Sequence, residues 1–366
     1  MATGFVWHEL YGWHDTGTYN GLLAPSATVQ PWQHFESAES KTRFASLVEV
    51  SGLAEKLTRI VPVTATEEDI LRVHTRDYLD RIQRESATVK GGDAGDGTSP
   101  FASGAFEIAS LAAGGAIAAA RAVMNGEVRN AYALIRPPGH HSRPTTGMGF
   151  CIFANASIAI KSIRADMGVG RIATVDWDVH HGNGTQEIFY SDPNTLTISI
   201  HQDGLFPLNS GYLTDRGEGT GEGYAMNVPL PGGSGNGAYI ETFERVVVPA
   251  LRRFKPELIV VPSGFDASAA DPLGRQMVTP TGYRAMTKLL MEVADEVCDG
   301  RIVMTHEGGY SPFYVPYCGL AVLETMSGHK TDFDDPVTPG WDQLPGQECM
   351  EHQRAVIESV IALHGL

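Results

Sequence analysis

The segment VDWDVHHGNGT, residues 175–185, places two aspartates and two histidines within six positions. Asp176, Asp178 and His180 are spaced by two, so on an extended segment their side chains would point to the same side. Asp178 and His180 are therefore candidates to bind one metal ion together. Asp266, at the end of the apolar run LIVVPSGFD, is the best candidate for a third ligand.

Three protein ligands leave a position open for water and substrate, as a catalytic zinc site requires. An Asp/His/Asp set is richer in oxygen than the common zinc sets, so Fe(II), Co(II) or Mn(II) would also suit it. Each aspartate taken singly is more simply explained as a strand-end cap or a solvated turn residue. The three together, beside a double histidine, favour a metal site.

A second cluster handles protons rather than metal. In RPPGHH, two prolines and a glycine precede His140 and His141, so the approach is fixed and the turn is sharp. Two adjacent imidazoles with different pKa values can serve as general base and general acid for a water held by the metal. Asp176 and Asn183 are at hand to orient them. The structural alternatives are a pair of satisfied buried histidines or a pair of metal ligands.

Tyr310 follows two glycines in HEGGY, at the end of the apolar run RIVMT. The glycines permit a bend that aims the phenol inward, where it would stabilise the oxyanion formed when an amide is attacked. A tyrosine in this setting is more often a packing residue, so the other clusters must support this interpretation.

The elements that carry these residues are short apolar runs rich in β-branched side chains, typical of strands buried on both faces of a parallel sheet. Helical patterns, such as residues 106–127 and 281–300, lie between them, which predicts an α/β fold with right-handed crossovers. Each polar cluster follows a strand, so we expect the clusters to meet at the carboxyl edge of the sheet. Residues 88–100 are predicted to be a loop. Residues 327–348 are predicted to be irregular, with a final helix after them.

Composition and net charge argue against several classes of protein. The 366 residues are 42% hydrophobic, with a formal net charge of −16, which disfavours nucleic-acid binding. The four cysteines are far apart and none forms CxxC, so a reducing compartment fits. The first residues do not read as a signal peptide, and no apolar run is expected to span a bilayer. We expect a soluble cytoplasmic protein. No repeat or linker is evident, so residues 1–366 are predicted to form one domain.

The motifs LIRPPGHH, GMGFCIFAN, VDWDVHHGNGT, SGFDASAADPL and EGGY occur in this order over most of the chain. This set resembles the zinc-dependent histone deacetylase family, and most of all its class II-like bacterial members, the histone deacetylase-like amidohydrolases. The resemblance implies an arginase-like α/β fold with an eight-stranded parallel sheet flanked by helices. It also implies zinc-dependent hydrolysis of an Nε-acyl-lysine amide in a protein or peptide, which releases a carboxylate and a free amine.

The resemblance also implies roles for single residues. The zinc ligands would be Asp178, His180 and Asp266. His141 would be the general base and acid, with His140 as its electrostatic partner and Tyr310 as the catalytic tyrosine. Asp176 would stand behind His140, and Asn183, where class I members have aspartate, behind His141. Substrate would meet the Phe150 and Phe206 walls, the Gly149 carbonyl and the rim acid Asp96. Structural potassium ions are implied at Asp176, Asp178, His180, Ser199 and Ile200, and at carbonyls of Phe189, Asp192, Thr195 and Tyr224.

Three other functions were weighed. An acetylpolyamine deacetylase shares the fold, but its class II branch has glutamate after DP, where this sequence has Leu273; the acidic Asp96 and Glu9 keep this alternative open. A binuclear manganese ureohydrolase would need further carboxylates after Asp266, where the sequence reads ASAAD. A non-catalytic acyl-lysine binding module would lack a ligand, a histidine or Tyr310, and all are present.

The region of residues 1–45 is predicted to be a long N-terminal loop. Its aromatic residues Trp13, Tyr19 and Trp32 would, if exposed, form an oligomer interface and cover a neighbour's active-site mouth. We therefore expect a homo-oligomer, a dimer or tetramer. The alternative is that these rings pack on their own subunit.

Overall fold

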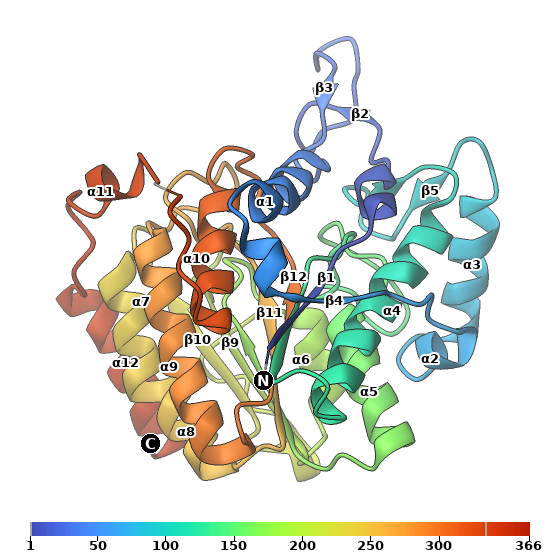
Figure 1. Cartoon of the computed structure of the whole chain (residues 1–366). Helices are drawn as coiled ribbons and strands as arrows, with labels where there is room; N and C mark the ends of the chain where they lie inside the picture. The colour runs from blue at the N-terminus through green and yellow to red at the C-terminus, as the bar shows by residue number, and fades with distance from the viewer. Residues whose placement is uncertain (1, 334) are drawn as a thin grey trace.

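The computed structural model describes residues 2–333 and 335–366 and is built around one parallel sheet (Figure 1). Its strands run in the order β10-β9-β8-β11-β12-β7-β1-β4, and every neighbouring pair is parallel. The strands of this sheet are β1 (Thr3–Val6), β4 (Thr58–Ile60), β7 (Asn130–Ala133), β8 (Ile172–Asp176), β9 (Thr195–Gln202), β10 (Ala225–Leu230), β11 (Leu258–Ser263) and β12 (Ile302–His306). The predicted eight-stranded α/β fold is confirmed.

Helices cover both faces of the sheet (Figure 1). They are α1 (Glu39–Val50), α2 (Glu67–Leu71), α3 (Arg76–Ser86), α4 (Ala105–Met124), α5 (Asn155–Met167), α6 (Asn183–Phe189), α7 (Asn236–Thr242), α8 (Val248–Phe254), α9 (Pro280–Cys298), α10 (Val315–Ser327), α11 (Thr338–Trp341) and α12 (Glu351–His364). Short 3-10 turns occupy Glu9–Trp13, Leu53–Lys56 and Gly219–Gly221, and a π turn occupies Phe243–Val247.

Two apolar clusters hold these layers together. Alternate residues of a strand point to opposite faces, so in β11 Ile259 packs into one cluster and Val260 into the other. The first cluster joins the sheet to α1, α7, α8, α9, α10 and α12, and the second joins it to α2, α3, α4 and α5. Burial on both faces explains why the strands read as continuous apolar runs.

Several predicted elements are found with small shifts at their ends. The helices predicted at 106–127 and 281–300 are α4 and α9. The loop predicted at 88–100 holds part of a two-stranded pair, β5 (Gly92–Asp93) and β6 (Pro100–Phe101). The segment 327–348 is irregular apart from α11, and α12 follows it as the final helix.

Helix α4 corrects one expectation about apolar runs. It is long and apolar enough to cross a membrane by length and composition, which the sequence was not expected to provide. However, 78% of its apolar window is buried inside the fold, against the sheet and α5. Its alanines and glycines allow this close approach: a Cβ on Gly115 would lie 2.6 Å from the Tyr11 hydroxyl. This burial is typical of a core helix.

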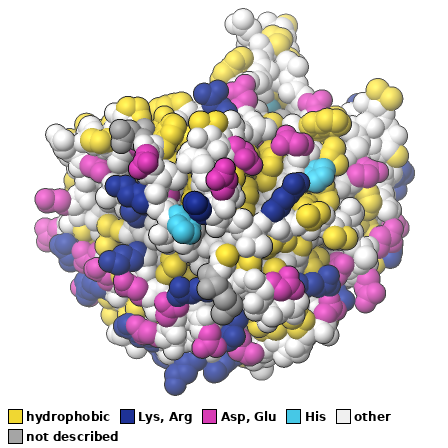
Figure 2. Space-filling view, in the orientation of Figure 1, with side chains coloured by type: hydrophobic (Ala, Val, Ile, Leu, Met, Phe, Trp, Pro, Cys, Tyr) yellow, Lys and Arg dark blue, Asp and Glu magenta, His cyan; other side chains and the backbone are white. Residues whose placement is uncertain are grey.

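The region predicted to be a long loop, residues 1–45, instead contains β1 of the sheet and the start of α1, and only the segment between them leaves the compact body. Its hairpin of β2 (Thr18–Tyr19) and β3 (Trp32–Gln33) projects beyond the carboxyl ends of the strands (Figure 1). Trp13 is 72% exposed and Trp32 is 56% exposed, whereas Tyr19 packs edge-on against His34 at 5.0 Å between ring centroids. On the face shown in Figure 2, acidic and basic side chains are interspersed among hydrophobic ones.

A buried ion cluster ties this N-terminal region to the sheet. Arg136, just after β7, donates from Nε and Nη2 to the Glu36 carboxylate at 2.9 and 2.8 Å. Its Nη1 donates to the carbonyl oxygens of Tyr11 and His14 at 3.0 and 2.6 Å. Lys41 Nζ lies 3.2 Å from the same carboxylate, and all three charged side chains are buried. Because Arg136 directly precedes PPGHH, this cluster also anchors the turn that carries the two histidines.

We predict that Glu36→Gln lowers the free energy of unfolding by about 3–5 kcal/mol, because it leaves Arg136 and Lys41 facing each other without a counter-charge. Urea denaturation at pH 7 measures the change. Arg252→Gln is the matched control: its partner Glu296 is at the surface, so the loss should stay below about 1 kcal/mol. Equal losses in the two variants would show that the buried cluster is not a special contributor.

Candidate active site

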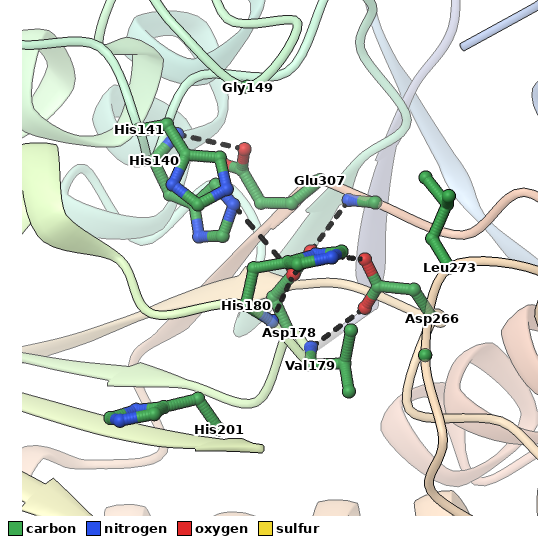
Figure 3. A network of polar contacts seen from close by, with 12 residues as sticks. His140, His141, Gly149, Asp178, Val179, His180, His201, Asp266, Leu273 and Glu307 are labelled. Atoms are coloured by element: carbon green, nitrogen blue, oxygen red, sulfur yellow. Dashed lines mark hydrogen bonds and ion pairs between the residues drawn. The ribbon is translucent and has the colours of Figure 1, made fainter. Parts of the chain in front are cut away.

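Asp178, His180 and Asp266 converge at the carboxyl edge of the sheet (Figure 3). His180 Nδ1 lies 3.1 Å from Asp178 Oδ1 and 3.1 Å from Asp266 Oδ2, and the three side chains are buried. In a tetrahedral site with bonds of 2.0–2.1 Å, ligand atoms are separated by roughly 3.3 Å. Donor chemistry and spacing therefore fit one divalent metal ion.

The path of the chain differs from the expected extended segment. Strand β8 ends at Asp176, and the residues after it turn. The turn is held by bonds from the backbone N–H of Asp178 to Asp176 Oδ1 and from that of His180 to Asp178 Oδ1. The ligands thus meet because the loop curls, not because alternate residues of a strand share a face.

The carboxylates of Asp178 and Asp266 repel each other when both are ionised. Although burial opposes it, the positive charge of His140 and hydrogen bonds from His180 hold the pKa of Asp178 below its usual range. Burial and the charge of Asp178 raise the pKa of Asp266 to about 6. Gly308 must lack a side chain here, since a Cβ would lie 2.0 Å from Asp266 Oδ2. A bound cation would relieve the repulsion between the carboxylates.

The histidine pair lies beside this cluster. His140 Nδ1 is 2.9 Å from Asp176 Oδ2, and His141 Nδ1 is 2.8 Å from Asn183 Oδ1. The two rings are 3.9 Å apart between centroids. Glu307 also belongs to this hydrogen-bonded group. Its carboxylate accepts from the backbone N–H of His140 at 3.0 Å and from that of the preceding glycine at 2.6 Å. Both imidazoles are thus fixed in position and rotation.

The surroundings of the two imidazoles shift their pKa values in opposite directions. Burial favours the neutral form of His140, but the charges of Asp178 and Asp176 outweigh it and raise its pKa to about 10. Burial, followed by the charges of His140 and His180, holds the pKa of His141 well below its usual range. His141 is therefore the neutral member of the pair at pH 7, which is the form that a general base requires.

A cavity of about 290 Å³ opens onto these groups. Its lining residues are Leu22, Thr98, His141, Gly149, Phe150, His180, Leu205, Phe206, Leu273 and Tyr310. The Phe206 ring stands perpendicular to His141 at 5.0 Å, and the Phe150 ring stands perpendicular to Tyr310 at 5.5 Å. Gly149 has φ +54°, and a Cβ there would lie 2.2 Å from the His141 ring. The predicted walls Phe150 and Phe206 are in this lining, as are Gly149, predicted to meet the substrate N–H, and Leu273, singled out for specificity.

Tyr310 enters the cavity from the loop after β12. Its backbone N–H donates to Asp271 Oδ2 at 2.7 Å, and Lys41 Nζ lies 5.3 Å from its ring centroid. Burial, followed by the nearby carboxylates, raises the pKa of its phenol well above the usual range. Tyr310 therefore keeps its proton and can donate a hydrogen bond.

Comparison with known proteins agrees with this geometry. The histone deacetylase domain model matches residues 34–326. The chain is 46% identical to the histone deacetylase-like amidohydrolase of Pseudomonas aeruginosa, over 100% of this chain and 96% of that protein. It is 40% identical to a probable deacetylase of Archaeoglobus fulgidus, over 90% and 87%. The crystal structure of the HDA15 HD domain matches with a TM-score of 0.82 and 30% identity, over 99% of this chain and 100% of that one.

The chain belongs to the histone deacetylase family. It is accordingly a hydrolase that acts on amide bonds, and its fold is that of the family. Histone deacetylase 8 of Arabidopsis thaliana, at 34% identity over 98% of this chain and 95% of that protein, is a relative of the same length class.

Asp96 and Ser199 are not among the residues that line the cavity of this deacetylase-family site. Asp96, predicted to be a rim acid, accepts from the backbone N–H of Gly149 at 2.8 Å and of Thr98 at 2.9 Å. It thereby shapes the Gly149 turn. Ser199, on β9, is 2.9 Å from His201 Nδ1 and accepts from the N–H of Gly182.

The other predicted potassium residues lie around the start of β9. The carbonyl oxygens of Phe189, Asp192 and Tyr224 accept backbone N–H bonds of 2.9, 3.3 and 2.8 Å. The last of these comes from Thr197 and joins the segment before β10 to β9. Ile200 is buried in the same strand.

The sequence analysis missed several functional-site residues, among them Glu307, Asp271 and the cavity-lining residues Leu22, Thr98 and Leu205. Glu307 lies in HEGGY and Asp271 in ASAADPL, but neither motif shows that its carboxylate will be buried. Asp271 accepts from the backbone N–H groups of Leu273 and Tyr310, and burial, followed by the charge of Asp266, raises its pKa to about 8. Leu22 comes from the projecting loop, and no sequence signal ties it to the cavity.

We predict that the purified chain binds one zinc ion and that zinc raises its Tm, because only the folded state holds the three ligands together. Elemental analysis after dialysis measures the stoichiometry. Asp266→Asn should weaken zinc affinity by about a hundredfold or more, since even outer-shell losses cost ~10–100-fold. Asp203→Asn, an exposed carboxylate, is the control and should bind zinc normally. Two ions per catalytic site would instead indicate the binuclear alternative.

Proposed function

We propose that the chain is a zinc-dependent deacylase that hydrolyses the amide of Nε-acetyl-lysine, or a related Nε-acyl-lysine, in a protein or peptide. The products are a carboxylate and the free amine. The observation that carries this proposal is the largely apolar cavity lined by His141, Tyr310 and His180, because His180 also belongs to the Asp178–His180–Asp266 cluster.

Asp178, His180 and Asp266 would hold the zinc ion. Bound there, it supplies Lewis acidity toward the amide carbonyl and the attacking water. An Asp/His/Asp set also suits Fe(II) or Co(II), so zinc is proposed from the family rather than from the ligands alone. Among the described residues this is the single group of three metal-ligating side chains that converges, which supports one ion over a binuclear manganese site.

The proton path runs through the histidine pair. His141, neutral before reaction, takes a proton from the attacking water and returns one to the lysine nitrogen as the C–N bond breaks. The contact of His141 Nδ1 with Asn183 leaves Nε2 as the atom that exchanges the proton. His140, held by Asp176, would act as the electrostatic partner of His141 and favour the developing negative charge on the carbonyl oxygen. The Tyr310 hydroxyl donates to that oxygen in the transition state.

The cavity walls suit the stem of an acyl-lysine. Phe150 and Phe206 offer flat apolar faces, and burying each methylene between them is worth about 0.8 kcal/mol. The carbonyl oxygen of Gly149 would accept the substrate amide N–H. Asp96 would act through its hold on the Gly149 turn, and a direct contact with a peptide backbone is proposed as well.

An acetylpolyamine substrate is the second candidate. The two acidic residues that favoured it, Asp96 and Glu9, are both engaged with other groups. Asp96 is engaged with Gly149 and Thr98, and Glu9 accepts from the indole N–H of Trp7 beside a different cavity. Leu273, which lines the active-site cavity, offers no charge to a distant ammonium. These placements support acyl-lysine.

Two further features are proposed from the family resemblance. Potassium ions would bind at the Asp176–Ser199 and Phe189–Tyr224 groups described above. A homo-oligomer would use the N-terminal segment that ends in the β2–β3 hairpin. Trp13 and Trp32 are exposed in this segment, and Leu22 of the same segment lines the active-site cavity. Tyr19, by contrast, packs on its own subunit.

We predict that Tyr310→Phe lowers kcat by ~10²–10³-fold with zinc content unchanged, because one oxyanion donor is worth about 3–4 kcal/mol in the transition state. Steady-state kinetics on an acetyl-lysine peptide measure the loss. Tyr317→Phe, a half-buried tyrosine in α10 outside the cavity, is the control and should retain full activity. Normal turnover by Tyr310→Phe would remove that residue from the mechanism.

The substrate class is tested by kcat/KM on an acetyl-lysine peptide beside N-acetylputrescine and N8-acetylspermidine, each with a hydroxamate control. We expect the peptide to be preferred by tenfold or more, ~1.4 kcal/mol in transition-state binding. Leu273→Glu should shift the ratio toward the polyamines, because it adds a carboxylate to the cavity wall. Preference of the unaltered protein for polyamines would contradict the acyl-lysine proposal and leave the chemistry standing.

A further inference from the structure

A second cavity lies at the opposite end of the sheet from the active site. It has a volume of about 350 Å³ and is lined by Arg171, Leu196, Arg216, Glu222, Gly223, Tyr224, Ala250, Arg253, Phe254 and His364. Arg171 directly precedes β8, and His364 ends α12, so the cavity lies between the amino ends of the strands, α8 and the C-terminal helix near the marked C-terminus (Figure 1). Strand β8 puts about 13 Å between this end and Asp176.

Positive charge dominates the wall of this cavity. Arg171, Arg216 and Arg253 face it from three separate segments, against one carboxylate, Glu222, which is 3.4 Å from Arg216. Such a concentration of arginine stands out in a chain of formal net charge −16. Guanidinium groups match the geometry of phosphate oxygens through paired N–H donors. The wall is therefore built for an anion.

The arginines have capacity left for a ligand. Within the described ranges, the Arg171 guanidinium makes no side-chain hydrogen bond or ion pair and lies 6.0 Å from the Phe254 ring centroid. Arg216 Nε is buried and has no hydrogen-bond partner there. Arg253 is partly engaged, since its Nη1 donates to the His364 carbonyl at 2.7 Å.

His364 provides an independent sign of a missing ligand. Its side chain is more than nine-tenths buried, and its Nε2 has no hydrogen-bond partner in the part of the chain that the structure describes. Leaving a buried polar group unpaired costs about 1–3 kcal/mol. Burial, followed by the charges of Arg216 and Arg253, lowers the pKa of His364 to about 4, so the ring is neutral near pH 7. A neutral imidazole can exchange a hydrogen bond with a phosphate oxygen or hydroxyl.

The remaining wall is apolar. Leu196 and Phe254 are buried, and Ala250 lies beside them in α8. A free phosphate ion would contact the arginines and leave this wall and much of the volume unfilled. We propose that the cavity binds a small phosphomonoester: the phosphate meets Arg171, Arg216, Arg253 and His364, and a compact apolar substituent covers Leu196 and Phe254.

This site is separate from the proposed deacylase chemistry, because it shares no residue with the active-site cavity. Tyr224 lines it and also belongs to one proposed potassium group, so potassium concentration must be held constant in any test. The proposal therefore stands or falls independently of catalysis.

The test is isothermal titration calorimetry with phenyl phosphate and with inorganic phosphate, at low ionic strength so that the charges are not screened. We expect one saturable site per chain, with phenyl phosphate bound more tightly. Arg171→Gln should weaken binding roughly tenfold or more, since a charge-assisted hydrogen bond is lost. Arg171 is exposed, and its guanidinium forms no ion pair with the described residues, so the variant should fold normally; Arg171→Lys, which keeps the charge, should recover part of the affinity.

Arg252→Gln is the matched control. It lies next to Arg253 in α8 but pairs with Glu296 outside the cavity, and its affinity should stay within about twofold of the parent. Absence of saturable binding would overturn the proposal. Binding unaffected by Arg171→Gln would place the anion elsewhere and overturn it too. Equal affinity for the two probes would reduce the site to one for free phosphate and refute the phosphomonoester.

Discussion

The structure depends on a concentration of buried carboxylates at one edge of the sheet. Asp176, Asp178, Asp266, Asp271 and Glu307 are all buried there. Water cannot stabilise their charge, so each must be met by protein donors or by a cation, or else take up a proton, as the raised pKa of Asp271 indicates. Backbone N–H groups and two histidines supply most of these donors. The carboxylates of Asp178 and Asp266, which both face His180, are the pair that a bound metal ion would neutralise. The same charges set the protonation of the histidines, so metal binding and proton transfer share one electrostatic origin.

Parallel strands explain how a single edge gathers these groups. Every strand of the sheet ends at the same side, and the loops after β7, β8, β11 and β12 bring the histidine pair, the metal-type ligands and Tyr310 to adjacent positions. The loops then fix them through their own backbone: Gly308, for example, donates its N–H to Asp178 at 2.8 Å and lacks the Cβ that would collide with Asp266. Arg136 joins the loop after β7 to the N-terminal region.

The sequence predicted the fold and the convergence of the site because both follow from local patterns: buried strands read as apolar runs, and polar clusters sit at their ends. It did not predict what depends on distant packing. Asp178 and His180 meet through a turn, Glu307 and Asp271 become buried supports, and Leu22 reaches the cavity from a hairpin more than a hundred residues away in sequence. Helix α4 was predicted correctly, but its apolar run was judged too short to span a bilayer; its length and composition pass that test, and its burial marks it as a core helix. The roles of single residues and the single-domain extent stay predictions.

Strand β8 joins two regions of opposite electrostatic character. Its carboxyl end delivers Asp176 into the acidic cluster, and its amino end begins beside Arg171 in the arginine-lined cavity. The net charge of the chain acts on ions that approach from solution, and salt screens its effect beyond the Debye length, about 8–10 Å at ordinary salt. Within a cavity, the nearest groups decide. An acidic protein can therefore hold a cation at one end of a strand and an anion at the other, because each ion is stabilised by the charged groups in contact with it and Coulomb energy falls with distance.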